Sequence, residues 1–165
     1  MSTIRNILVP VDFHTHSEAL VEVALSMAHK LDAASLTFLH VIPQLPDYSD
    51  YKPDTLKQLE ATFFAQAEDK MSVLMESVKE RMAGVDAVVV SGEAADAILT
   101  HARDRQVDLI VIATHGAQGM EKVLLGSVAD RVIKGAPCPT LVFNPFRKER
   151  GYEVCTPLSS CVQTV

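Results

Sequence analysis

A glycine-rich loop in the last third of the chain contains the residues best suited to binding chemistry. It reads ATHGAQGMEKVLLGSVADR at residues 113–131, with glycines at 116, 119 and 126 ahead of Ser127. Backbone N–H groups in such a loop, together with the positive end of a following helix, can bind an anion such as phosphate. We expect these glycines to adopt strained dihedral angles that turn their N–H groups inward. A plain crossover loop would have the same glycine spacing, so the spacing alone leaves both alternatives open.

A second candidate is Asp12, which directly follows an apolar run near the N-terminus. A carboxylate there can accept a hydrogen bond from a ligand hydroxyl or, through water, contact Mg²⁺. A turn or helix-cap aspartate is the structural alternative, but the position at the end of an apolar run favours a functional role. His14 and His16 lie close by without further Cys or His ligands at zinc-like spacing, so we predict no metal site.

Five short apolar runs are predicted to be the strands that position these residues. They are Ile4–Val11, Ser35–Ile42, Val85–Ser91, Val107–Ala113 and Pro139–Phe143. Four of them are almost continuous Ile, Leu and Val, which is typical of parallel strands covered on both faces. Helical patterns separate the runs and begin near Thr15, Asp54, Ala94 and Ser127. The first and last carry capping-box spacings, Thr15 with Glu18 and Ser127 with Asp130.

Strands that alternate with helices predict an α/β fold with a doubly wound, Rossmann-like parallel sheet and helices on both faces. We predict five strands in the order 3-2-1-4-5. Ligands of such sheets bind beyond the carboxyl ends of the strands, where the strand order reverses. We expect residues 1–144 to form one domain and residues 145–165, which lack periodicity, to form a tail.

Two further residues are expected to be structural. His40 lies within the second apolar run, and we expect a hydrogen-bonded core histidine. Phe63 belongs to the apolar stripe of the second helical pattern, and we expect the whole stripe to pack against the rest of the domain.

Composition narrows the class of protein. The chain has 165 residues, 48% of them hydrophobic and 22% charged, and a net charge of −6. This charge argues against nucleic-acid and anionic-membrane partners. We find no apolar signal core at the N-terminus and no apolar run of the roughly 20 residues that a membrane span needs. Cysteines 138, 155 and 161 form no CxxC pair, so we expect reduced thiols in a cytoplasmic protein.

Two segments resemble the universal stress protein family, in its nucleotide-binding branch. They are NILVPVDFHTHSEALVEVAL, residues 6–25, and DLIVIATHGAQGMEKVLLGSVADRVIKGAPCPTLVF, residues 108–143. The resemblance extends from about residue 4 to residue 144. The ATP-binding loop of that family reads G-2x-G-9x-G-[S/T]. Here the pattern falls on Ala113, Gly116, Gly126 and Ser127, so alanine replaces the first glycine.

The resemblance implies an adenine nucleotide as cofactor, ATP with Mg²⁺ as a candidate ion. Carried over to this chain, it implies an adenosine subsite at Pro10, Val11, Asp12 and Val41, phosphate contacts at Gly116, Gly126, Ser127 and Val128, and an approach lined by Ile112 and Ala113. It also implies a homodimer paired through strand 139–143. The alternative is a family member that has lost nucleotide affinity through Ala113 and acts only through protein contacts.

Other classes that share this kind of sheet fit less well. The loop has neither the Gly-Lys-[Ser/Thr] of a Walker A motif nor GxGxxG. A receiver domain needs an acid after strand 3, where Ser91 stands, and a lysine after strand 5, where Asn144 stands. An adenylating nucleotidyl transferase would have the motif HxGH after strand 1, and the His-Thr-His sequence at 14–16 lacks its glycine. No nucleophile and base lie near the loop, so we predict a stress-response binding protein with at most slow ATP hydrolysis rather than an enzyme.

Overall fold

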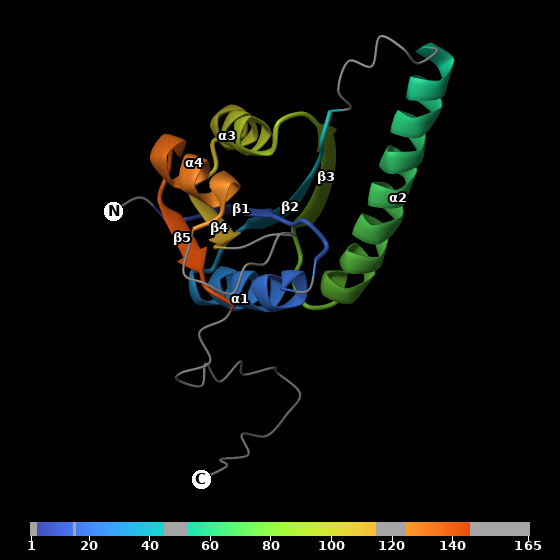
Figure 1. Cartoon of the computed structure of the whole chain (residues 1–165). Helices are drawn as coiled ribbons and strands as arrows, with labels where there is room; N and C mark the ends of the chain where they lie inside the picture. The colour runs from blue at the N-terminus through green and yellow to red at the C-terminus, as the bar shows by residue number, and fades with distance from the viewer. Residues whose placement is uncertain (1–2, 15, 45–52, 115–124, 146–165) are drawn as a thin grey trace.

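The computed structural model describes residues 3–14, 16–44, 53–114 and 125–145. In these residues, strands and helices alternate along the chain (Figure 1). The strands are β1 (Asn6–Pro10), β2 (Ser35–Ile42), β3 (Val85–Ser91), β4 (Leu109–Ala113) and β5 (Thr140–Phe143). The helices are α1 (Ser17–Lys30), α2 (Pro53–Lys79), α3 (Ala94–Asp104) and α4 (Ser127–Gly135).

The strands form one parallel sheet in the order β3-β2-β1-β4-β5, which confirms the predicted topology. Leu8 of β1 lies opposite Thr37 of β2 on one side and Ile110 of β4 on the other. Helix α1 covers one face of the sheet, and α3 and α4 cover the other (Figure 1). Strand order reverses between β1 and β4, so a ligand site is expected beyond the carboxyl ends of these two strands.

Each face of the sheet contributes to its own apolar core, because successive side chains of a strand point to opposite faces. Ile7 and Val9 of β1 pack with residues of α1 and α2, whereas Leu8 packs with residues of α3 and α4. All three side chains are at most 1% exposed. Burial on both faces explains why the strands lack the polar alternation of a half-exposed sheet.

The predicted strands were one or two residues too long at some ends. Strand β1 covers Asn6–Pro10 rather than Ile4–Val11, and β4 begins at Leu109 rather than Val107. Strand β5 begins at Thr140 because Pro139 has no N–H, although the Pro139 carbonyl accepts a hydrogen bond from Ile110 N at 3.0 Å.

Both predicted capping boxes are wrong. His16 occupies the N-cap position of α1, and Gly126 occupies that of α4, so Ser127 is the first helical residue and not the cap. Thr15 lies outside the described residues. A side-chain cap that the sequence did not indicate begins α3, where Glu93 accepts a hydrogen bond from Asp96 N at 3.1 Å.

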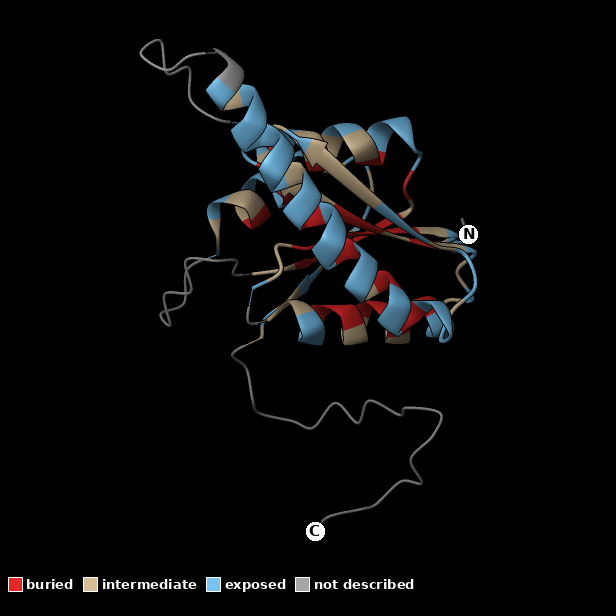
Figure 2. Cartoon of the chain, turned by 90° about the vertical axis from the view of Figure 1, so that its right-hand side faces the viewer, coloured by how far each residue is buried: buried red, intermediate tan, exposed pale blue. Residues whose placement is uncertain are grey.

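Helix α2 is buried along only its second half. Met71 and Met75 are 3% and 8% exposed, in contact with the α1 side of the core. Leu59 and Phe63 are 41% and 37% exposed, so the expectation that Phe63 packs into the core is wrong. The reason is geometric, since the N-terminal half of this long helix reaches away from the sheet (Figures 1 and 2).

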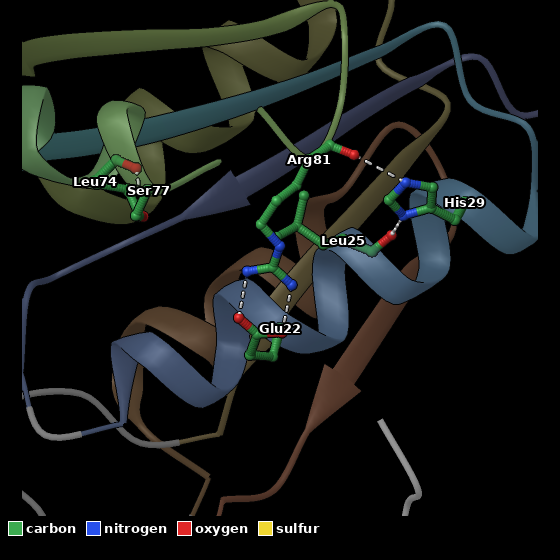
Figure 3. Close-up of polar contacts among 6 residues, drawn as sticks. All are labelled: Glu22, Leu25, His29, Leu74, Ser77 and Arg81. Atoms are coloured by element: carbon green, nitrogen blue, oxygen red, sulfur yellow. Dashed lines mark hydrogen bonds and ion pairs between the residues drawn. The ribbon is translucent and has the colours of Figure 1, made fainter. Parts of the chain in front are cut away.

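The C-terminal end of α2 is fastened to α1 by polar contacts (Figure 3). The Arg81 guanidinium forms a two-bond ion pair with Glu22, at 2.6 Å and 2.7 Å. The ring of His29 contacts the carbonyl oxygens of Leu25 and Arg81, at 2.8 Å and 3.1 Å. These contacts hold one end of α2, whereas its other end lacks such an anchor among the described residues.

The Glu22–Arg81 pair predicts a pH-dependent stability. The hydrogen bond from Arg81 lowers the pKa of Glu22 below its ordinary 4.5, while partial burial acts in the opposite direction. A carboxylate with a lowered folded-state pKa stabilises the fold above its unfolded pKa, and this stabilisation is lost as pH falls through the folded pKa. Both partners are about one third exposed. Glu22→Gln should therefore cost roughly 0.5 kcal/mol of unfolding free energy near neutral pH.

Urea unfolding over a pH series measures this difference. The gap between wild type and Glu22→Gln should close as pH falls well below 4.5, where Glu22 is protonated in both states. Glu76→Gln, on an exposed position of α2, is the matched control and should show no gap. A gap independent of pH would mean that the ion pair does not carry the effect.

The turn between α2 and β3 requires glycine. Gly84 has φ of +76°, and a Cβ at this position would collide with the carbonyl oxygen of Ala34. Gly84→Ala should therefore lower the unfolding free energy by about 1–3 kcal/mol. The added methyl group would push the Ala34 backbone aside, and alanine would also have to adopt a left-handed conformation that it disfavours. Gly135→Ala, where the added Cβ meets only the movable side chain of Leu99, is the control and should cost less. Equal losses in thermal or urea unfolding would contradict this reading.

Candidate functional site

The candidate site lies where β1 and β4 end side by side. The two strands pair in parallel, with Ile7 opposite Leu109 and Leu8 opposite Ile110. Their carboxyl ends therefore meet at the same edge of the sheet, and the segments that follow them become neighbours. One segment contains Asp12, and the other begins at Thr114 and returns at Gly126.

The Asp12 carboxylate organises the turn between β1 and α1. Its Oδ1 accepts hydrogen bonds from His14 N at 3.1 Å and from the Ser17 hydroxyl at 2.9 Å. Its Oδ2 lies 3.5 Å from His14 Nδ1, and the side chain remains 43% exposed. Asp12 is thus a turn aspartate, which was the structural alternative considered from the sequence. Its carboxylate also remains partly exposed to solvent, so it can still accept a hydrogen bond from a ligand hydroxyl.

Val11 supports this turn from beneath. Its N–H donates to the Leu39 carbonyl at 2.9 Å, and its carbonyl lies 2.7 Å from His40 Nδ1. Its side chain is buried at 5% exposure. Because both backbone groups are already paired, Val11 fixes the position of the next residues. The expectation that His40 is a core residue is wrong in one respect, since this side chain is only half-buried.

The residue between Asp12 and His14 adopts an unusual conformation. Phe13 has φ of 59°, which non-glycine residues rarely adopt. Its ring lies 4.8 Å from the ring of His40, and the Lys70 ammonium lies 5.9 Å from the Phe13 ring centroid. These contacts connect the turn after β1 to β2 and α2. The sequence did not indicate these contacts, because they join segments far apart in the chain.

A pair of backbone hydrogen bonds closes the base of the glycine-rich loop. Gly126 N donates to the Thr114 carbonyl at 2.7 Å, and Thr114 N donates to the Phe143 carbonyl at 2.8 Å. Gly126 has φ of −60° and ψ of 150°, so the expectation of a strained dihedral angle is wrong at this glycine. The other predicted loop glycines, Gly116 and Gly119, lie outside the described residues.

The first turn of α4 presents its backbone N–H groups next to this closed base. Asp130 N makes the first helical bond, to the Gly126 carbonyl at 2.9 Å. No side chain of the described residues caps the helix, because Gly126 has none to offer. Ser127 is exposed and Val128 is half-buried. This end of the helix therefore combines backbone donors that pair with none of the described residues, a hydroxyl and the positive end of the helix dipole.

The remaining predicted residues line the two sides of the sheet. Ile112 is buried in the core beneath α3 and α4, and Val41 packs against the same core. Ala113 packs against the opposite core, beneath α1. Pro10 ends β1 and is half-buried. Ile112 is thus a core residue whose backbone alone can face a ligand.

The basic residues of α4 are already paired with carboxylates. Arg131 contacts Glu93 and Asp96, each at 2.7 Å, and so joins α4 to the start of α3. Lys134 lies 2.7 Å from Asp130. An anion at the start of α4 would therefore be bound by backbone donors and Ser127 rather than by these two cations.

Cys138 lies apart from the site and is a free thiol. Burial, followed by the nearby Asp108 carboxylate, raises the pKa of this thiol above its ordinary value. A protonated thiol is a poor nucleophile, which fits a packing role.

The described residues contain no group of three His, Cys, Asp or Glu side chains that could hold a metal ion. His14 lies beside the single carboxylate of Asp12. None of the described helices combines the length and apolarity needed to cross a membrane.

Comparison with known proteins now adds to this geometry. The model of the universal stress protein family matches residues 3–144. A universal stress protein of Thermus aquaticus is 33% identical over 144 residues, covering 84% of this chain and 97% of the relative. The solved structure of UspA from Lactobacillus plantarum has a TM-score of 0.76 at 27% identity and covers 87% of this chain and 99% of its own.

A more distant solved structure is that of the universal stress protein from Archaeoglobus fulgidus in complex with dAMP. Its TM-score is 0.59 at 20% identity, with 86% of this chain and 98% of that chain covered. At 20% identity, the similarity to this structure shows a shared fold and no more. Because the family model matches residues 3–144, which is most of the sequence, the chain belongs to the universal stress protein family.

Proposed function

We propose that this protein binds an adenine nucleotide, with ATP as the expected ligand, and acts as a stress-response regulatory protein. The observation that carries the proposal is the meeting of two features at the switch point of the sheet. One is the Asp12 turn after β1, and the other is the open N-terminus of α4 after β4. The first can accept hydrogen bonds from a sugar hydroxyl, and the second can donate to phosphate.

The predicted subsites keep their order in this arrangement. The adenosine would lie against Pro10, Asp12 and Val41, and the phosphates would lie at the start of α4, near Ser127 and Val128. The A. fulgidus relative in complex with dAMP supports an adenine nucleotide at this fold. Mg²⁺ would accompany the phosphates of ATP, whereas Asp12 would face the adenosine.

A second candidate function is protein binding without a nucleotide. It rests on Ala113, which stands where the family's loop has its first glycine. Ala113 is half-buried at the end of β4, so its methyl group lies partly in the core rather than wholly in the ligand path. This placement favours nucleotide binding over its loss.

The proposed role is binding rather than catalysis. Phosphoryl transfer needs cations that stabilise charge and a group that orients the attacking oxygen. Arg131 and Lys134 are engaged with carboxylates, and Asp12 lies at the adenosine end of the proposed site. We therefore propose at most slow hydrolysis, in a cytoplasmic protein with reduced thiols.

Thermal unfolding with and without ATP and magnesium tests the proposal. A ligand that binds only the folded state should stabilise it by about 2.7 kcal/mol at 100 times its Kd. Gly126→Val should retain the fold, because φ of −60° and ψ of 150° suits any residue, yet it should lose the ATP shift by crowding the phosphates. Ser91→Val, exposed at the end of β3, is the control and should keep the shift.

The outcomes separate the two candidate functions. No thermal shift at millimolar ATP and no nucleotide released on denaturing the purified protein would favour protein binding alone. Phosphate release at about 1 s⁻¹ or faster, lost in Ser127→Ala, would contradict the non-catalytic role.

We also propose a homodimer paired through β5. This strand lies at one edge of the sheet, so the backbone groups on its outer side have no neighbouring strand among the described residues. Val142 is 40% exposed there. A second copy could pair its own β5 with this edge and cover Val142.

Sedimentation measures the proposed dimer directly. Wild type should sediment at about twice the mass of one chain, and Val142→Lys should shift it toward the monomer by placing charge in the interface. Val73→Lys, on the exposed face of α2, is the control and should leave the mass unchanged. A wild-type monomer at high micromolar concentration would exclude pairing through β5.

A further inference from the structure

A second cleft lies between the end of β2 and α2, away from the nucleotide site proposed above. Its volume is about 460 Å³, within the range of small-molecule sites. Residues 40 and 42–44 form one wall, and Phe63, Gln66, Ala67 and Lys70 form the other. None of these residues belongs to the predicted nucleotide set.

The two walls follow from ordinary strand and helix periodicity. Phe38 packs beneath α1 and α2, and Val41 packs beneath α3 and α4, so alternation places His40 on the α2 side. On α2, the positions 63, 66, 67 and 70 have the spacing of a single helix face. The cleft is therefore on the opposite face of the sheet from Val41.

The cleft has an apolar floor with an apolar wall beside it. Ala67 is 4% exposed and Ile42 is 6% exposed, whereas Phe63 is 37% exposed above them. The nearby half of α2 extends beyond the sheet (Figure 2). The described residues leave the Phe63 side chain partly exposed to water. An apolar body of ligand size can contact these groups and remove them from water.

The polar side chains around the floor include one cation and two amides that can donate hydrogen bonds. Lys70 forms no ion pair with any described residue, and its ammonium contacts only the face of the Phe13 ring. Gln44 and Gln66 add side-chain amides. His40 donates Nδ1–H to the Val11 carbonyl and so belongs to the wall of the cleft without adding a donor for an anion. A cation and amide donors beside an apolar floor are complementary to an organic anion.

We propose that this cleft binds a small organic anion with an aromatic or apolar body. The body would lie on Phe63 and Ala67, and a carboxylate or sulfonate group would pair with Lys70. The proposal is independent of the nucleotide site, since it uses other residues on the other face of β2.

Fluorescence titration of the full-length protein with 8-anilinonaphthalene-1-sulfonate tests it, because this probe combines an aromatic body with an anionic group. We expect saturable binding of one probe per chain. Lys70→Gln, which removes the cation, and Gln66→Glu, which adds a negative charge, should each weaken it by about fivefold. Excess ATP should leave the probe bound.

Matched controls separate the cleft from general charge effects and from nonspecific probe binding. Lys79→Gln and Gln58→Glu make the same chemical changes on the same helix outside the cleft, and they should leave the affinity unchanged. Unfolding curves for all four variants show whether each is folded. Equal affinities in cleft and control variants, absence of saturable binding, or full displacement by ATP would each overturn the proposal.

Discussion

The parallel pairing of β1 with β4 is the constraint on which the rest of the structure depends. Both strands are apolar on both faces, so helices must cover the sheet from each side. Every connection then crosses a face, and all strands end at the same edge. The turn that carries Asp12 and the start of α4 meet at this edge because of that pairing, although more than 100 residues separate them in the chain.

The resulting site relies on backbone groups more than on charged side chains. The two basic residues of α4 are used to hold the helix, Arg131 against α3 and Lys134 against the helix itself. The hydrogen bond from Gly126 to Thr114 brings the two ends of the glycine-rich loop together directly before the first turn of α4. Donors fixed in this way need no reorganisation when an anion arrives, which favours its binding.

Helix α2 shows how one element can serve two purposes. Its second half buries Met71 and Met75 and is tied to α1 by the Glu22–Arg81 pair (Figure 3). Its first half extends beyond the edge of the sheet (Figure 1), and Phe63 in this half lines a cleft. Through Lys70 and His40, that cleft touches Phe13 and Val11, which support the turn of the nucleotide site.

The sequence by itself determined the strands, their parallel arrangement and their order, because near-continuous apolar runs between helical patterns have few other solutions. It also indicated the family and the strand ends where a ligand would bind, whereas the individual ligand contacts remain predictions. Only the tertiary structure decided that Gly126 rather than Ser127 caps α4, that Phe63 stays exposed and that His40 reaches Val11. Periodicity reports which face of an element is apolar. It does not report how far a helix extends past its sheet, nor which distant carbonyl a side chain meets, since both depend on contacts between segments remote in sequence.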